Sequence, residues 1–146
     1  MPGDAEPLRA ALNEAFADDA FFHEATPGSF AAFYLGSAHF DPSLWLLARD
    51  GDEVAGFALA FPQAAGDPTL GWIESFGVRR RWRRRGLGSA LLHLTFRALL
   101  ERGLRRVGLG VDAKNETGAV DLYRRAGMRT VRRRDNWVLD VSKQTA

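Results

Sequence analysis

The chain has 146 residues, enough for one domain with a hydrophobic core, and no cysteine, which excludes disulfides and thiolate metal sites. Hydrophobic residues make up 46% and charged residues 26%, which is the balance of a soluble globular protein and excludes a disordered or fibrous chain. No uninterrupted apolar run is long enough to span a bilayer, and no basic-then-apolar signal pattern opens the chain. We therefore expect a cytoplasmic protein that binds neither a metal nor a membrane.

The first half of the chain predicts two helices followed by a β-hairpin. Leu8–Phe16 has apolar residues on one helical face, and a second helix is expected over Phe30–Ser37, with Ser29 as its N-cap. Leu44–Arg49 and Val54–Phe61 alternate like strands, and the Asp-Gly pair between them is a typical hairpin turn.

The middle of the chain predicts a strand, a cationic glycine loop and a helix in immediate succession. Leu70–Val78 is rich in β-branched and aromatic residues, and its neighbours on both sides predict a central position in the sheet. A run of arginines then leads to Gly86-Leu87-Gly88 and to an amphipathic helix over Leu87–Arg102. This order offers unpaired backbone N–H groups and the positive end of a helix dipole to an anion. For the loop taken alone, a tight turn followed by solvated arginines is the alternative.

The last third predicts a strand parallel to the central one, then a helix and more strand. Gly103 ends the long helix, and Leu104–Val111 is nearly all apolar after its arginines, so the three elements form a βαβ unit. Glu116–Arg125 predicts a helix. Met128–Arg132 and Asn136–Val141 predict either a hairpin or one bent strand.

Two motifs occurring in this order resemble the signatures of the GNAT N-acetyltransferase superfamily. Arg83-x-x-Gly86-x-Gly88 after a strand is similar to the family's coenzyme A pyrophosphate loop, and Asn115 ahead of a helix carrying Tyr123 and an Ala-Gly-Met exit resembles the second signature. The resemblance implies one acyl-coenzyme A-binding domain over residues 1–146. Its fold would be α/β (α+β), a mixed sheet of about six strands with about four helices on its faces. The second motif also resembles the C-terminal halves of tandem GNAT proteins such as mycothiol synthase.

The resemblance implies transfer of an acetyl group from acetyl-coenzyme A to a primary amine, directly within a ternary complex. Backbone N–H groups and positive charge would hold the diphosphate. The residues expected to supply them are Arg83, Arg84, Arg85, Gly86, Leu87, Gly88 and Ser89.

The pantetheine arm is expected along the backbone of Phe76, Gly77 and Val78. In the family a bulge splays this strand from its parallel neighbour into a wedge, where an N–H faces the thioester carbonyl, and Gly77 fits that bulge. A mere weak point in the strand is the alternative for Gly77. Asn115 would either hydrogen-bond the pantetheine or cap the following helix.

Two residues are candidates for moving protons. Tyr123 takes the family's general-acid position, the alternative being a packed ring with a solvated hydroxyl. Glu74 lies mid-strand on the face expected to carry Trp72 and Phe76, and is the best candidate base, the alternative being a structural charge paired with an arginine. The three histidines are each expected to be surface or packing residues: His23, His39 and His93.

Charge is divided unevenly between the two halves of the chain. Residues 1–70 carry two arginines and eleven acidic residues, a balance of −9, whereas residues 71–146 carry eighteen basic and seven acidic residues, a balance of +11. This division suits an anionic ligand on the second half and a cationic small-molecule amine near the first. Mutual neutralisation of the halves across the fold is the alternative.

Two other functions remain open. Family members usually begin with a strand, and only residues 1–7 precede the first predicted helix here. A coenzyme-binding regulatory or degenerate domain is therefore an alternative, and a second copy or a companion domain would then cover the sheet edge. Residues 79–85, with Trp82 among the arginines, also fit a nucleic-acid surface, which is less favoured because the net charge is only +2.

Overall fold

A computed structural model describes residues 5–15, 26–111, 119–133, 137 and 139–143. Its helices and strands, in chain order, are α1 (Ala5–Ala15), α2 (Pro27–Phe30), β1 (Trp45–Asp50), β2 (Glu53–Phe61), β3 (Leu70–Val78), α3 (Leu87–Glu101), β4 (Arg106–Leu109) and α4 (Ala119–Arg125). A π-helical turn, Ala31–Leu35, continues α2, and short 3₁₀ turns precede β1 (Pro42–Leu44), follow β3 (Arg80–Trp82) and lie at Val141–Lys143. In this described part no helix is both long and apolar enough to cross a membrane.

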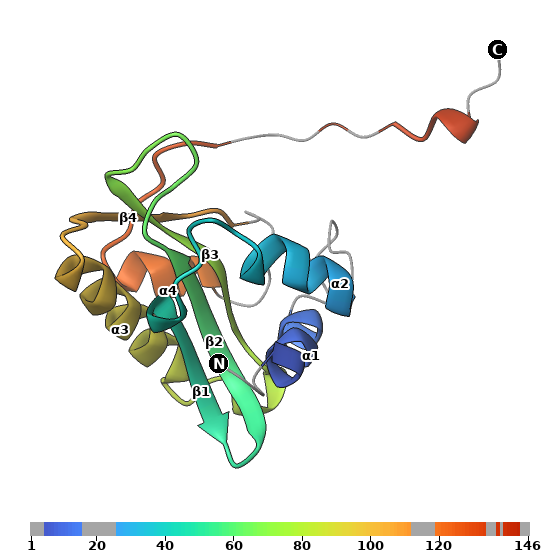
Figure 1. The fold of residues 1–146 in the computed structure, drawn as a ribbon, viewed down its shortest axis with the longest axis horizontal. Helices are drawn as coiled ribbons and strands as arrows, with labels where there is room; N and C mark the ends of the chain where they lie inside the picture. Colours follow the sequence, from blue (N-terminus) through green and yellow to red (C-terminus); the bar gives the residue numbers. More distant parts are fainter. Residues whose placement is uncertain (1–4, 16–25, 112–118, 134–136, 138, 144–146) are drawn as a thin grey trace.

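The strands form one mixed sheet in the order β1-β2-β3-β4. The first two pairings are antiparallel, and β3 pairs with β4 in parallel. Helix α3 supplies the crossover from β3 to β4, which is the predicted βαβ unit. Figure 1 shows α1 and α2 on one face of the sheet and α3 with α4 on the other.

Each face of the sheet carries its own hydrophobic core, because alternate residues of β2 point to opposite sides. On the α1 face, Phe57 and Leu59 pack with Leu8 and Leu12, and all four are buried. The core on the other face is built on α3, and its buried members are Leu44, Ala60, Ile73, Leu92 and Leu99.

The predicted hairpin and the long helix are both present. The β1–β2 turn places Gly51 at φ 61°, a left-handed conformation that glycine adopts readily. Helix α3 begins at Leu87 as predicted, and Gly103, at φ 84°, follows its end.

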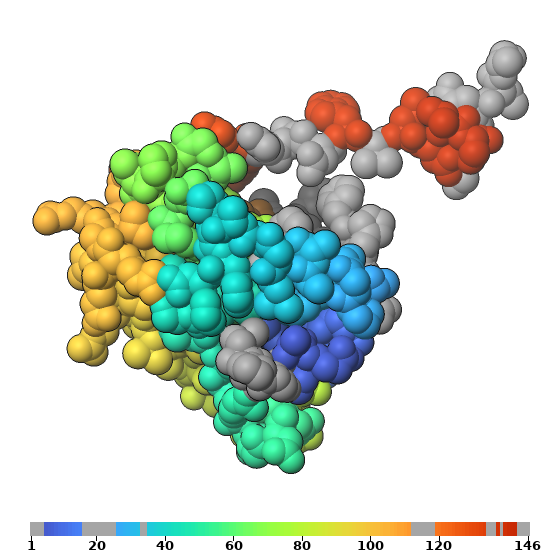
Figure 2. All heavy atoms as spheres, in the orientation of Figure 1, coloured from blue at the N-terminus to red at the C-terminus, as the bar shows by residue number. Residues whose placement is uncertain are grey.

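The strand count differs from the prediction, since the described residues form four strands rather than about six. Residues 128–133 lie outside any strand, as do the described members of Asn136–Val141. The described residues 139–143 stand away from the body (Figures 1 and 2), and Trp137 is 93% exposed. Alternation predicts the strand character of a segment, but a strand also needs a partner within reach.

Candidate active site

The pairing between strands β3 and β4 ends about halfway along β3. Their parallel pairing runs only from Leu70 opposite Arg106 to Ile73 opposite Leu109, whereas β3 continues to Val78 paired with β2. Beyond Ile73, therefore, the edge of β3 that faces away from β2 has no strand partner among the described residues. The end of this pairing is consistent with the wedge that the family resemblance implies.

The bulge that accompanies the parting lies at Glu74 and not at Gly77. Leu59 of β2 pairs with Ser75 and the next residue, Ala60, pairs with Ile73, so Glu74 is the extra residue. Pairing at Gly77 is regular, opposite Phe57.

One inserted residue also changes which side chains share a face. Trp72 and Glu74 lie together, the indole Nε1 donating to Glu74 Oε2 at 2.9 Å. Phe76 instead packs in the α3-face core, so the expectation that it shares a face with Glu74 is wrong. Gly71 and Ile73 also face α3, which places Trp72 and Glu74 on the α1 face.

Gly77 serves close packing rather than a bulge. A Cβ at this position would lie 2.8 Å from Cζ of Phe57 and 3.1 Å from Cβ of Ala15. Only glycine lets the ring of Phe57 and the end of α1 approach the backbone of β3 this closely.

The start of α3 is an open cradle of backbone N–H groups. Gly86 is its N-cap, at φ 80°, and no side chain accepts a hydrogen bond there. Ala90 N–H donates to the Gly86 carbonyl at 3.1 Å, which leaves the N–H groups of Leu87, Gly88 and Ser89 without an intrahelical acceptor. A Cβ on Gly86 would meet no atom within 4 Å in the part of the chain that the structure describes, so the side chains of that part leave this position open.

The arginines around this loop divide into structural and exposed side chains. Arg83 Nε donates to the Val78 carbonyl at 2.8 Å, fixing the loop to the end of β3. Arg84 and Arg85 are exposed, and Arg84 holds a left-handed φ of 63°. Arg79 and Arg81 form ion pairs with Glu53 at 3.5 and 3.3 Å.

Trp82 is a structural residue as well. It is 6% exposed, its Nε1 donates to Asp50 at 2.9 Å, and the guanidinium groups of Arg79 and Arg81 lie 5.0 and 4.3 Å from its ring centre. A buried indole cannot offer its faces to nucleotide bases, so the geometry does not favour the nucleic-acid hypothesis.

Tyr123 lies on α4, directly over the free part of β3. Its ring packs edge-on to Phe76 with centroids 5.9 Å apart. Burial disfavours the charged phenolate and raises the pKa of Tyr123 to about 12. The neighbouring Leu122 reaches the cradle, since a Cβ on Gly88 would come within 3.1 Å of its Cδ2. The structure thus brings together Phe76, Gly88 and Tyr123.

The other candidate proton carriers are placed as follows. Glu74 is exposed on the α1 face, opposite to Tyr123. His39 is exposed with its Nε2 3.1 Å from the side-chain nitrogen of Gln63, and His93 is exposed on α3. Asn115 and His23 lie outside the described residues.

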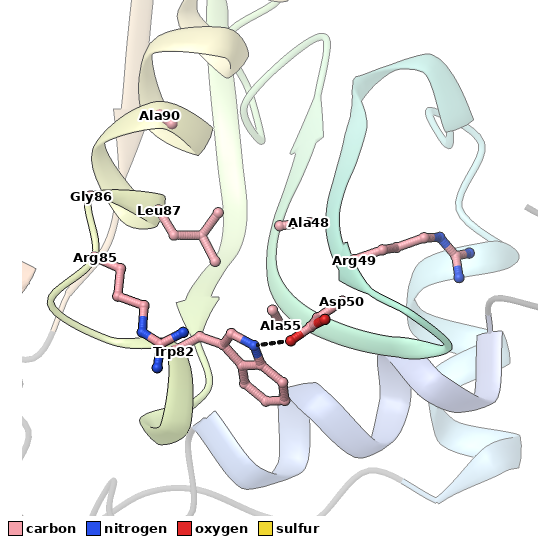
Figure 3. A pocket seen from close by; sticks show the side chains of 9 residues that line it. All are labelled: Ala48, Arg49, Asp50, Ala55, Trp82, Arg85, Gly86, Leu87 and Ala90. Carbon is pink, nitrogen blue, oxygen red and sulfur yellow. Dashed lines mark hydrogen bonds between the residues drawn. The ribbon is translucent and has the colours of Figure 1, made fainter.

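A pocket of about 430 Å³ opens on the β1 side of the start of α3. Figure 3 shows Leu87 and Arg85 facing Ala48 and Asp50 across it, with the Trp82–Asp50 hydrogen bond at one end. It contains neither Glu74 nor Tyr123 and does not include the free edge of β3, so it is separate from the wedge.

Sequence reasoning missed the pairing of Trp72 with Gly108. These residues lie opposite each other in β3 and β4, and a Cβ on Gly108 would come within 2.9 Å of Cζ3 of Trp72. The available signals were the Trp-x-Glu spacing in one strand and a glycine inside the next.

Comparison with known proteins gives a consistent family. The model of the acetyltransferase (GNAT) family matches residues 9–128. A mycothiol acetyltransferase of Pseudarthrobacter chlorophenolicus is 35% identical over 148 residues, covering 97% of this chain and 42% of the relative. One from Streptomyces scabiei is also 35% identical and covers 89% and 41%. The chain thus spans about two fifths of the length of these curated relatives.

Solved structures agree. A GCN5-related N-acetyltransferase from Sphaerobacter thermophilus is 41% identical with a TM-score of 0.73, covering 88% of this chain and 39% of that one. A transcriptional regulator from Bacillus halodurans has a TM-score of 0.74 at 19% identity, a likeness of fold alone.

Proposed function

Since the chain belongs to the GNAT acetyltransferase family, we propose that it transfers the acetyl group of acetyl-coenzyme A to the primary amine of a small molecule. The observation that carries the proposal is the parting of β3 and β4 beside an open helix N-terminus. The edge of β3 beyond this pairing would suit an extended arm that carries amides, and the cradle would suit the diphosphate at the other end of that arm.

The cradle residues have defined tasks in this proposal. The N–H groups of Leu87, Gly88 and Ser89, with the positive end of the α3 dipole, would bind the diphosphate. The exposed guanidinium groups of Arg84 and Arg85 would add charge, and Arg83 would hold the loop against Val78. Backbone groups of Phe76, Gly77 and Val78 on the free edge of β3 would hydrogen-bond the amides of the pantetheine arm. Asn115 is proposed to support this arm.

Glu74 and Tyr123 would act from opposite faces of the sheet. Acetyl-coenzyme A supplies an activated thioester, so the new bond joins the amine nitrogen to the carbonyl carbon while the carbon–sulfur bond breaks. Glu74 would accept the amine proton, directly or through water, from the α1 face. Tyr123, which the raised pKa keeps protonated at neutral pH, would give a proton to the leaving sulfur from the α4 face.

The binding half of the proposal is tested by titration calorimetry with acetyl-coenzyme A. Gly86→Val is expected to weaken binding roughly tenfold or more, about 1.4 kcal/mol, because a side chain would enter the cradle and strain its φ. Gly66→Val is the matched control: Gly66 also has a positive φ, 76°, and open space around it, but lies in a distant turn. Equal loss in both variants, or no heat with the wild type, would contradict the proposal.

The catalytic half is tested by thiol release from acetyl-coenzyme A across a panel of amines. Polyamines and aminoglycosides belong on it, because the first half of the chain carries a charge of −9 and suits a cationic acceptor. We expect release with at least one amine and a fall of roughly 10²-fold in kcat for Tyr123→Phe. Binding without release from any amine, and no effect of Tyr123→Phe, would instead indicate a coenzyme-binding regulatory domain.

A further inference from the structure

We infer that Trp72 is a positioning residue for the proposed base Glu74, and that the Trp72 ring is held in place by packing against Gly108. The inference rests on the proposed function, in which Glu74 accepts the proton of the attacking amine. It concerns Trp72 and Gly108, through which the fold sets the orientation of the Glu74 carboxylate.

The bulge places Glu74 where the strand parting begins, but does not by itself fix its side chain. Glu74 is exposed, and an exposed glutamate has several rotamers of similar energy. The Trp72 indole N–H, 2.9 Å from Oε2, selects among them. An indole nitrogen only donates, so Oε2 is the acceptor in this contact, and the other oxygen, Oε1, is left for the amine or a water.

The Trp72 ring can keep this orientation because it packs against Gly108 of β4, which has no side chain. Gly108 lies directly opposite Trp72 in the parallel register, and a Cβ there would come within 2.9 Å of Cζ3 and 3.1 Å of Cε3. At Gly110, the residue after the end of β4, an added Cβ would lie 4.0 Å from Cζ2 of Trp72, an ordinary contact distance. Trp72 and Gly108, the next-to-last pair of β3 and β4, thereby orient the carboxylate of Glu74, the first residue of β3 after that pairing.

Two variants perturb the contact differently. Trp72→Phe removes the N–H and keeps an aromatic ring, while Gly108→Ala keeps the indole and displaces its ring. Both are expected to lower kcat roughly tenfold with the best amine of the panel, because a base moved by a fraction of an ångström transfers protons poorly. The acetyl-coenzyme A dissociation constant is expected to stay within twofold of wild type, and Gly110→Ala is the control expected to retain activity.

A double-mutant cycle separates positioning from general structural support. Glu74→Gln alone is expected to lower kcat roughly 10²-fold, and adding Trp72→Phe to it should change kcat by less than twofold, because Trp72 acts through Glu74. If Trp72→Phe costs as much in the Glu74→Gln background as in the wild type, the positioning role is wrong.

A second readout needs no acceptor. Nitrogen-labelled protein gives one indole N–H resonance for each of its four tryptophans. The Trp72 resonance is expected to shift in Glu74→Gln and Gly108→Ala but to stay in place in Gly110→Ala. An unmoved resonance in Glu74→Gln overturns the inference. A shifted resonance in a protein that acetylates no amine would leave the contact standing and overturn the proposed function.

Discussion

At the scale of the residue, Tyr123 combines a packed ring with a phenol that burial keeps neutral. Its pKa is raised to about 12, whereas an unfolded chain ionises tyrosine near 10. The folded state therefore keeps this proton to higher pH than the unfolded state. The resulting contribution to stability is complete below about pH 10 and is lost as the pH rises from about 10 to 12.

Alkaline titration checks this directly. The chain has two tyrosines, so the difference in phenolate absorbance between the wild type and Tyr123→Phe isolates one of them. We expect a midpoint near pH 12, and no fall in acetyl transfer from ionisation of Tyr123 below about pH 10. A midpoint near 10 would place the hydroxyl in water and remove the physical basis for its protonated state in alkaline assays.

Gly77 gives a second prediction at this scale, about packing rather than chemistry. Gly77→Ala is expected to lower the free energy of unfolding by about 1–3 kcal/mol, because the new methyl group would meet Phe57 at 2.8 Å in a closed core. Gly28→Ala, whose methyl group would meet no atom within 4 Å, is the matched control and should change stability by less than about 0.5 kcal/mol. Urea denaturation of the two variants decides it, and equal stabilities would show that the ring of Phe57 moves aside freely.

At the scale of the element, the parting of β3 from β4 is the feature on which the site depends. Four residues of each strand pair, and among the described residues the strand pairing on this edge of β3 ends at Ile73. Helix α4 crosses this region and brings Tyr123 and Leu122 to it, while α3 brings the cradle. Backbone N–H and C=O groups need hydrogen-bond partners, so the edge of β3 at Phe76 and Val78 would suit a ligand that offers amide partners there.

The last segment gives a prediction at the same scale. Trp137 is 93% exposed, against 5% for Trp45 and 6% for Trp82, so its fluorescence should resemble that of indole in water. We expect Trp137→Phe to remove the most red-shifted and most acrylamide-accessible component of the emission. Blue-shifted, quencher-resistant emission from Trp137 would show instead that residues 137–141 pack as the strand that their alternation predicts.

At the scale of the whole molecule, the sheet separates the two residues that we propose as proton carriers. One face carries α3 and α4 with the cradle and Tyr123, and the other carries α1, Trp72 and Glu74. A group held between the parted strands is accessible from both faces. This geometry suits a transfer in which one partner gains a bond on one side while a leaving group takes its proton on the other.

Local chemistry made several parts of this protein predictable from sequence. The Asp-Gly turn specified the hairpin, the glycine after the arginine run specified the start of α3, and the order of the two motifs indicated the GNAT family. These features depend on backbone preference and on neighbours close in the chain, which a sequence displays directly.

Only the tertiary structure decided the rest, because it depends on which strands meet. The bulge fell at Glu74 instead of Gly77, since register is set by the packing of whole strands, and that single residue moved Phe76 to the face of Tyr123. The ion pairs of Arg79 and Arg81 also depend on which strands meet, because their acidic partner Glu53 lies in β2. The packing of Trp72 against Gly108 joins residues 36 positions apart in the sequence, and a pattern within one strand does not predict such a contact.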